Sequence, residues 1–499
     1  CAAIVHRGAN SMSHDVIAAT RHYIDKLVGD PNNPGMKVLL LDDSTTKTVS
    51  MVYSQTQILE KEIYLVEHLE KTRRHEPMRH LKATVFVRPT PANLELLKAE
   101  LASPKFAEYH IFFSNIAPTE MVNALADADE EELVRQVQEY YGDYVAVNEE
   151  LFTINQRYSL RLSAHEPTST PQLKELFQRN VSAVLSALLS LKMQPSAIRY
   201  QGTSRVAKAV AQAASQAITS DGIFHFARGS SSRDVERPLL LILDRADDAV
   251  TPLLSQWTYQ AMVHELLGLN NNRVRIKMDN SEEEEAVLSC TQDSFFAQHR
   301  HANFGDLGMA VKQLLEDYQA QSKLNEKVST VEEMQSFMHR YPAFRSQSLN
   351  FSKHLALTTE LSRLVEACSL MEVSCLEQDL ACNDDPSAQW RELQTHIRSP
   401  KIKVPDKLRL ALLFALRYEG SANVDNKLRV LLDEARLPPE KIALLTAILR
   451  YGGKAMRGPG LYGSGSSLMS KMTKAIAKGL EGIENVYTQH LPLLLQTLG

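Results

Sequence analysis

Residues 37–43 read KVLLLDD, an apolar run that follows one lysine and is closed by two aspartates. The same kind of run returns as TVFV at residues 84–87 and as HIFF at residues 110–113, with helical periodicity between the runs. Short apolar runs that alternate with helical patterns predict a parallel sheet whose strands are buried on both faces. A helix over residues 13–28 is predicted before the first run, and the α/β domain is expected to end near Val147.

A further apolar run, LLLIL at residues 239–243, is typical of a central parallel strand. It follows a helical pattern at residues 173–191, and the polar, proline-containing residues 158–172 before that helix predict a surface loop. The sequence therefore predicts a second α/β domain.

From Trp257 onward the pattern is almost entirely helical. Pro342 lies between two helical stretches, and proline removes a backbone hydrogen bond and disfavours helix in the residue before it. We therefore expect a helical hairpin or hinge at Pro342. The helices expected in this region cover residues 304–318, 328–341, 351–380, 407–418 and 426–437.

The composition excludes several classes of protein. The chain has 499 residues and a net charge of −5, and its lysines and arginines are not clustered. A nucleic-acid binder that works through bulk electrostatics is therefore not expected, and the length predicts several domains. No apolar stretch reaches the ~18 residues that span a bilayer, and the acidic runs at residues 129–132 and 282–285 are expected to be solvated helix starts or loops.

The five cysteines are an odd number, which favours free thiols in the reducing cytosol. Cys368, Cys375 and Cys382 recur every seven residues. On a helix, consecutive sulfurs would lie about 10.5 Å apart, too far for one zinc ion with its ligands at ~2.3 Å. We expect no metal and no other cofactor.

Two short motifs lack the context that their chemistry needs. The glycines of residues 458–463 fit G-x-G-x-x-G, but they follow a helical pattern where a pyrophosphate site requires a strand. His264 and Glu265 begin a zincin-like helix, but Gly268 stands where the second histidine ligand is needed. The G-x-S-x-G elbow of α/β-hydrolases does not occur.

The strongest candidate for catalysis is the acidic cluster after the LLLIL run. Asp244, Asp247 and Asp248 would lie at the carboxyl end of a parallel strand and could hold Mg²⁺ for phosphoryl chemistry. The interpretation that we favour is that Arg245 pairs with these acids and that they cap the next helix. A magnesium-dependent phosphohydrolase is kept as the enzymatic alternative.

Two consecutive short helices are predicted after the third run, one opened by residues 118–120 and one by a capping-box pattern at residues 129–132. Their apolar side chains could line a groove for a helical or extended peptide, although spacing alone favours packing against the sheet. These side chains are Met121, Val122 and Leu125 on the first helix and Leu133, Val134 and Val137 on the second.

Longer stretches resemble the SM family, the cytosolic proteins that bind syntaxin-type SNAREs and guide membrane fusion. The resemblance covers roughly residues 12–498 and is carried by PLLLILDRADDAVTPLLSQWTYQAMVHELL at residues 238–267, LEQDLA at 376–381 and KLRLALLFAL at 407–416. Within the family, residues 37–67, 109–115 (YHIFFSN), 304–308 (FGDLG) and 484–492 (ENVYTQHLP) are most similar to the vacuolar-protein-sorting branch, which serves the trans-Golgi and endosomes.

The resemblance implies an arch-shaped fold with two parallel-sheet α/β domains and a large, mostly helical third domain. Because the family's second domain is completed by a C-terminal segment that this sequence only approaches, we expect that domain to be incomplete, through truncation or through an exposed sheet edge. The implied divisions are an extension at residues 1–11, domain 1 at 12–147, domain 2 at 148–248 with 481–499, and domain 3 at 249–480 with a hairpin near 320–355.

Two surfaces for a syntaxin-type (Qa) SNARE are implied. An N-peptide pocket on the outer face of domain 1 matches Ile116, Val122, Val134, Val137 and Glu139. A central groove for the helical SNARE bundle matches Lys47 and Glu67, and Pro342 matches the hinge proline of the domain 3 hairpin.

The implied function is regulation without catalysis. The protein would clasp a trans-Golgi or endosomal syntaxin, promote SNARE assembly and reach Golgi and endosomal membranes only through its partners, from the cytoplasm. A subunit of a tethering complex is a further alternative.

Overall fold

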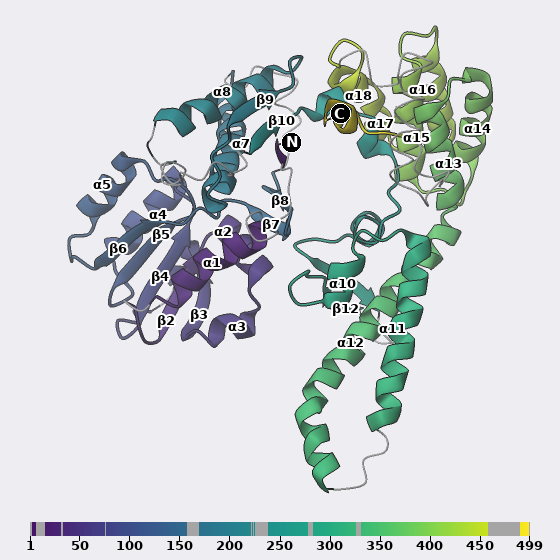
Figure 1. The fold of residues 1–499 in the computed structure, drawn as a ribbon. Helices are drawn as coiled ribbons and strands as arrows, with labels where there is room; N and C mark the ends of the chain where they lie inside the picture. Colours follow the sequence, from purple (N-terminus) through teal and green to yellow (C-terminus); the bar gives the residue numbers. More distant parts are fainter. Residues whose placement is uncertain are drawn as a thin grey trace. The chain divides into compact units, whose positions relative to one another are not determined.

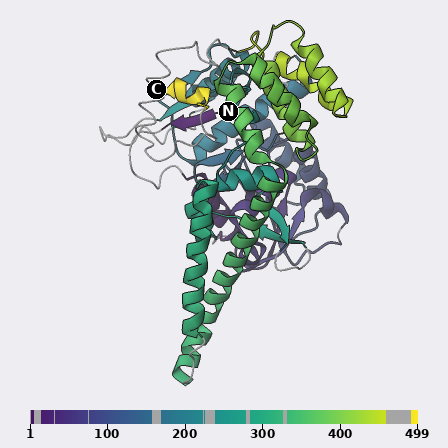
Figure 2. The same cartoon turned by 90° about the vertical axis from the view of Figure 1, so that its right-hand side faces the viewer.

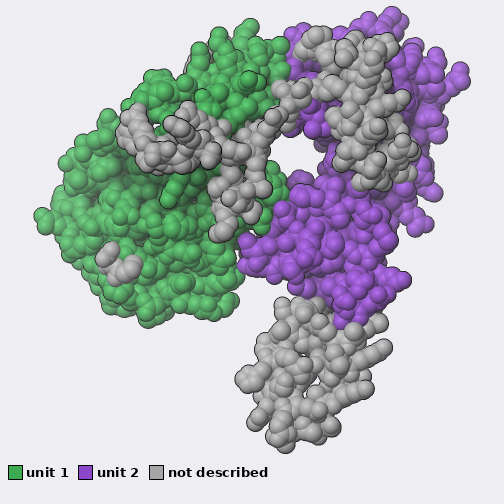
Figure 3. Space-filling model, viewed as in Figure 1, with its two compact units in different colours: residues 1–243 green, residues 244–499 purple. Residues whose placement is uncertain are grey.

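The chain divides into two compact units, unit 1 at Cys1–Leu243 and unit 2 at Asp244–Gly499 (Figure 3). The computed structural model describes residues 2–5, 15–30, 33–74, 76–156, 169–220, 222, 224, 238–277, 283–325, 331–457 and 490–498. The glycines of residues 458–463 and most of the polar loop at 158–172 lie outside these ranges. The division into three domains stays a prediction.

A five-stranded parallel sheet, with strand order β3-β2-β4-β5-β6, forms the centre of unit 1 (Figure 1). The three apolar runs are confirmed as strands β2, β4 and β5. The strands are β2 (Lys37–Leu41), β3 (Ile63–His68), β4 (Lys82–Val87), β5 (Tyr109–Phe113) and β6 (Val134–Glu139). The helices around them are α1 (Val16–Val28), α2 (Asp43–Val52), α3 (Gln55–Leu59), α4 (Pro91–Leu101) and α5 (Thr119–Ala128), with the 3-10 helix η1 (Leu69–Arg74).

The central strands are buried on both faces, which explains why they carry no polar alternation. Leu39 and Phe112 belong to the apolar cluster that includes α1 and α2. Their neighbours Leu40 and Ile111 belong to the cluster that includes α4 and α5. Successive side chains of a strand point to opposite faces, so each apolar run supplies both layers of the core.

Aspartates fix the starts of the first two helices. Asp15 accepts hydrogen bonds from the backbone of Ile17 and Ala18, and Asp42 forms a capping box with Thr45 at the start of α2. Asp42, which directly follows the first apolar run, therefore caps the next helix. A side chain that accepts these N–H groups stabilises a helix by about 1 kcal/mol.

Two helices were predicted after β5, and the prediction of the second one is wrong. The chain forms strand β6 there. Asp129, which the capping-box pattern placed before a helix, ends α5 and accepts hydrogen bonds from the backbone of Leu133 and Val134. Glu132 adopts a φ of 53°, which breaks the helical path. Pairing with β5 then completes the sheet, and this tertiary interaction outweighs local helical spacing.

The rest of unit 1 consists of two long helices and two small sheets. The helix predicted at 173–191 is confirmed as α7, and the LLLIL run forms β10, which is central in a three-stranded sheet, parallel to β9 and antiparallel to β1. Part of the predicted N-terminal extension thus forms strand β1. These elements are β1 (Ala2–Val5), β7 (Val145–Asn148), β8 (Leu151–Thr153), α7 (Pro171–Ser190), β9 (Ala197–Tyr200), α8 (Arg205–Ser220) and β10 (Leu239–Ile242).

Unit 2 is mostly helical, but an antiparallel hairpin of β11 and β12 lies where helix was expected. The acidic run at residues 282–285 was predicted to be a helix start or a loop, but residues 283–285 belong to strand β12. Glu285 of β12 forms an ion pair with Arg273 of β11. The first elements are η3 (Arg245–Asp247), η4 (Thr251–Leu253), α9 (Tyr259–Met262), the π-helix η5 (Val263–Leu267), β11 (Arg273–Lys277), β12 (Glu283–Val287) and α10 (Ser294–His299).

Two long helices, α11 (Phe304–Asn325) and α12 (Val331–Ala367), run side by side in opposite directions (Figures 1 and 2). The two helices are connected between Asn325 and Val331, and not at Pro342, where a hairpin or hinge was expected. The predicted interruption at Pro342 is wrong, because α12 continues through that residue as one helix. Neighbouring turns can hold a helix together around a proline, usually with a kink.

A smaller break does occur farther along, where one helix was expected over residues 351–380. Ser369 adopts a φ of 51° and separates α12 from α13. Helices α13 to α18 pack around a large apolar cluster that includes Leu410 and Leu413 of α15. They are α13 (Leu370–Cys382), α14 (Pro386–Arg398), α15 (Val404–Arg417), α16 (Val424–Glu434), α17 (Pro439–Ile442) and α18 (Leu444–Gly452). The short helix α20 (Leu493–Leu498) follows near the end of the chain.

A buried polar cluster joins α12 to α9 and α10. The His354 imidazole lies 2.9 Å from the Asp293 carboxylate and 2.8 Å from the Tyr259 hydroxyl, and the Lys353 ammonium also binds Asp293. Burial lowers the pKa of His354, although the hydrogen bond to Asp293 acts in the opposite direction. For Asp293, burial raises the pKa, but His354 and Lys353 outweigh it and bring the pKa to about 2.

We expect the stability of unit 2 to fall as the pH is lowered from about 7 to about 5. Neutral His354 is favoured in the folded chain, so unfolding takes up a proton below the ordinary histidine pKa of about 6.5, while Asp293 stays ionised. His354→Asn should reduce the pH slope of the unfolding free energy by up to ~1.4 kcal/mol per pH unit.

Urea unfolding followed by tryptophan fluorescence measures this slope, because the chain's two tryptophans, Trp257 and Trp390, both lie in unit 2. The control is His264→Asn, since His264 is exposed and its replacement should leave the slope unchanged. An equal slope in His354→Asn and the unsubstituted chain would contradict the prediction.

Candidate functional site

The residues matched to the peptide pocket lie on β6, on α5 and in the turn between β5 and α5. We call them the β6–α5 surface, defined as Ile116, Val122, Val134, Val137 and Glu139. Val137 is 38% exposed, which is high for a valine in a sheet, and Val122 and Val134 are half-buried. Apolar side chains that are partly open to solvent are available for a partner's side chains.

A register shift explains why Val134 and Val137 are spaced like helical neighbours. Val134 pairs with Tyr109 and Val137 with Ile111, with an irregularity between Tyr109 and His110. The extra residue of β6 at this β-bulge lets two valines three positions apart face the same side of the sheet. The spacing that predicted a helix is thus produced by a bulged strand.

Glu139 closes one end of the β6–α5 surface. One carboxylate oxygen accepts a 2.8 Å hydrogen bond from the backbone of Ala117, and the other accepts a 3.0 Å bond from the Tyr141 hydroxyl. Glu139 therefore fixes the turn after β5. Ile116, in that turn, packs against a different apolar cluster that includes Phe177 of α7, so its side chain is separated from the valines.

The two residues matched to the central groove lie near the carboxyl edge of the sheet. Lys47 is half-buried on α2, and Glu67 is on the edge strand β3, where it forms an ion pair of 3.6 Å with Lys71. The His68 imidazole and the Asp43 carboxylate, 3.4 Å apart, link the end of β3 to the start of α2. Lys47 and Glu67 thus both lie near the carboxyl edge of the five-stranded sheet.

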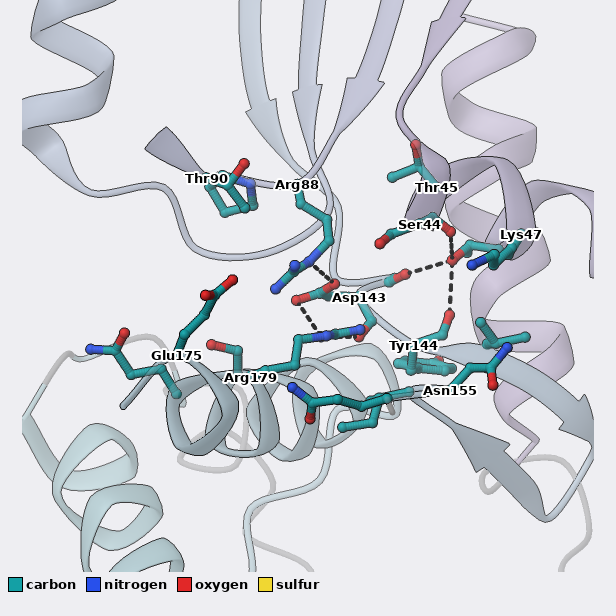
Figure 4. A pocket seen from close by; sticks show the side chains of 18 of the residues that line it. Ser44, Thr45, Lys47, Arg88, Thr90, Asp143, Tyr144, Asn155, Glu175 and Arg179 are labelled. Atoms are coloured by element: carbon teal, nitrogen blue, oxygen red, sulfur yellow. Dashed lines mark hydrogen bonds and ion pairs between the residues drawn. The ribbon is translucent and has the colours of Figure 1, made fainter. Parts of the chain in front are cut away.

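A cavity of about 750 Å³ lies next to Lys47, and the sequence analysis missed it. Arg88 after β4 and Arg179 of α7 both bind the buried carboxylate of Asp143, at 2.8 Å each (Figure 4). The arginines are far apart in sequence and follow no motif. The only sequence signal was the pair of aspartates at the end of β2, which marks where the carboxyl edge begins.

The acidic cluster of residues 244–248 is used for local structure. Asp244 accepts a 3.0 Å hydrogen bond from the backbone of Ala246, and Asp248 accepts bonds from the backbone and the hydroxyl of Thr251. The Arg245 side chain donates to the backbone carbonyl of Asp248 at 3.3 Å. The interpretation as caps is confirmed for Asp244, which is the N-cap of η3, and the predicted pairing of Arg245 is confirmed with Asp248.

The ranges described here contain no group of three or more histidine, cysteine or acidic side chains placed to hold a metal ion. Glu265 of the incomplete zincin pattern forms an ion pair with Arg409 at 3.0 Å. Within those ranges, no helix combines the length and the apolar character that a membrane span requires.

The sequence matches the Sec1 family over residues 37–499. It is 41% identical over 495 residues to the vacuolar protein sorting-associated protein 45 homolog of Arabidopsis thaliana, covering 97% of this chain and 84% of that protein. It is 42% identical over 492 residues to the human vacuolar protein sorting-associated protein 45, covering 97% of this chain and 83% of that protein.

Among solved structures, the chain is similar to the SM protein Vps45 in complex with the Qa SNARE Tlg2 (1-310), with a TM-score of 0.84 and 39% identity over 97% of this chain and 85% of the other. This likeness confirms the predicted α/β fold class and the resemblance found in the sequence. The chain belongs to the Sec1 family of SM proteins.

Proposed function

We propose that this protein binds a Qa SNARE of the trans-Golgi and endosomal route and promotes assembly of the SNARE complex. The observation that carries the proposal is the half-exposed valine strip of the β6–α5 surface, in a chain that is similar throughout to a Vps45 bound to a Qa SNARE. The protein would act from the cytoplasm and reach membranes through its SNARE partners.

The first contact in this proposal is with the N-terminal peptide of the SNARE. Val122, Val134 and Val137 offer apolar area, and β6 is an edge strand whose outer side pairs with no other described strand. An extended peptide gains backbone hydrogen bonds at such an edge and places alternate side chains against the valines. Glu139 would contribute by holding the turn after β5 in place.

The second contact is with the helical part of the SNARE at Lys47 and Glu67. Opposite charges at two positions on one edge can select the register of a helix that carries complementary charges. We propose that the α11–α12 hairpin also takes part in assembly and that Pro342 is where α12 bends. Two weak contacts on one partner reinforce each other through effective concentration.

Catalysis has no part in this proposal. A phosphohydrolase would need Asp244, Asp247 and Asp248 to share a metal, whereas Asp244 and Asp248 accept hydrogen bonds from the backbone that follows them. A carboxylate that accepts these N–H groups is held against its own backbone.

Val122→Arg tests the peptide contact. A guanidinium on the half-buried face of α5 would have to be desolvated against the apolar strip, which is unfavourable. We expect affinity for a Qa-SNARE N-terminal peptide, measured by calorimetry, to fall by at least about tenfold, or ~1.4 kcal/mol. Thermal stability should change little because the side chain is only half-buried.

Val430→Arg is the matched control, since Val430 is 58% exposed on α16 in unit 2. It introduces the same charge and should leave peptide affinity unchanged. Equal affinity of the Val122→Arg and unsubstituted proteins would place the peptide elsewhere.

Glu67→Lys tests the second contact. Reversing this charge should weaken binding of the full SNARE cytoplasmic region by roughly three- to tenfold, which corresponds to about 1 kcal/mol for one partly exposed charge. Binding of the N-terminal peptide alone should be unaffected. Glu434→Lys, which reverses an exposed charge on α16, is the control. If Glu67→Lys leaves the affinity for the full region intact, the groove assignment is wrong.

A further inference from the structure

The cavity beside Lys47 lies where α/β sheets of this topology bind small ligands. The chain leaves β2 toward β3 on one side and returns to β4 on the other, so the order β3-β2-β4-β5-β6 has its switch point between β2 and β4. In open parallel sheets, ligands bind outside the carboxyl ends of the strands at this point. The lining residues 44–48 follow β2, and residues 88–92 follow β4. We call this space the switch-point cavity.

Two arginines are held rigidly in the switch-point cavity. Arg88 binds one oxygen of Asp143 through Nε, and Arg179 binds the other oxygen and the backbone carbonyl of Asp143 through one Nη. Asp143 is only 2% exposed and accepts a further bond from Asn115. A buried carboxylate with three donors keeps both guanidiniums in fixed positions, which lowers the ordering cost of binding a ligand.

Each of the two guanidinium groups uses only one of its nitrogen atoms to bind Asp143. In the part of the chain that the structure describes, the other N–H groups of Arg88 and Arg179 donate to no residue, and the Lys47 ammonium has no ion-pair partner. Glu175, Gln178, Arg179 and Ser182 follow the spacing i, i+3, i+4 and i+7, which brings all four to one side of α7. Lys47, Arg88 and this side of α7 surround the same space (Figure 4).

We propose that the switch-point cavity binds a small organic polyphosphate. Arginine presents paired donors that match phosphate oxygens, and lysine adds a point charge that suits the same group. A cavity of about 750 Å³ has the size of sites for nucleotide-sized ligands. The start of α2 does not contribute its N–H groups, because Asp42 already accepts two of them.

The charged side chains that line the cavity favour an anionic ligand, except for one carboxylate that would repel it. The basic side chains are Lys47, Arg88 and Arg179, and the acidic ones are Asp143 and Glu175. The two arginines neutralise Asp143, and Glu175 is exposed. Burial lowers the pKa of Arg179 to about 10; the attraction of Asp143 opposes this shift, and the smaller repulsion from Arg88 adds to it. A further anion would relieve that repulsion. Glu175 is therefore the residue that limits affinity.

Calorimetry of the full chain without any SNARE tests the proposal, with inositol hexakisphosphate, ATP and pyrophosphate as probes. We expect saturable binding of at least one probe at one site per chain, weakened by added salt. The absence of binding for all three probes would overturn the proposal and would leave the SNARE proposal untouched.

Two substitutions locate the binding without disturbing Asp143. Lys47→Ala should weaken it by about tenfold, because a hydrogen bond to a charged group is worth about 1.5–3 kcal/mol. Glu175→Gln should strengthen binding severalfold, a gain that misfolding cannot produce. Lys427→Ala, at an exposed lysine of α16, is the control and should have no effect. Affinity that is unchanged in both Lys47→Ala and Glu175→Gln would place the site elsewhere.

The same phosphate chemistry occurs in free metabolites and in phosphoinositide headgroups. Sedimentation with vesicles that contain phosphatidylinositol bisphosphate separates the two sources. Vesicle binding that the soluble probe competes away identifies a headgroup, and binding of soluble probes alone identifies a metabolite. Vesicle binding that the probe leaves unchanged, with no binding of the probe itself, contradicts the proposal.

Discussion

Burial of β2, β4 and β5 on both faces is the constraint on which unit 1 depends. Leu39 and Leu40 are both 0% exposed, although they are neighbours that point to opposite sides of the sheet. A strand of this kind leaves only its two ends and the outer strands of the sheet for polar chemistry or partners. Every surface proposed here for unit 1 lies at one of these places.

The two kinds of surface differ in character for the same reason. The carboxyl edge collects side chains that follow the strands, such as Asp42 and Arg88, so it is polar and hydrogen-bonded. The outer strand β6 is covered on fewer sides, so Val137 stays partly exposed and the surface is apolar. An apolar strip suits a peptide, and a charged cavity suits a phosphate group.

Strands and helices whose apolar residues recur because they face the core could be predicted from the sequence. The runs that became β2, β4 and β5 and the helices α1 and α7 were found because apolar periodicity reflects the core directly. β6 was mistaken for a helix because its bulge spaces Val134 and Val137 three residues apart. The β11–β12 hairpin was not predicted, because glutamates on its exposed face hide the strand pattern. Pro342 suggested a break in the helical pattern, but α12 continues through it as one helix. The Asp143 cluster joins Arg88, Asn115 and Arg179, which are far apart in the sequence and which only the fold brings together.

Amide hydrogen exchange of the protein with and without a Qa-SNARE N-terminal peptide tests the central claim most directly. Exchange slows where a partner covers backbone or stabilises an element against local opening. The peptide is expected to slow exchange in α5 and β6 and to leave the helices around α15 unchanged. Saturating peptide that leaves α5 and β6 unprotected would contradict it.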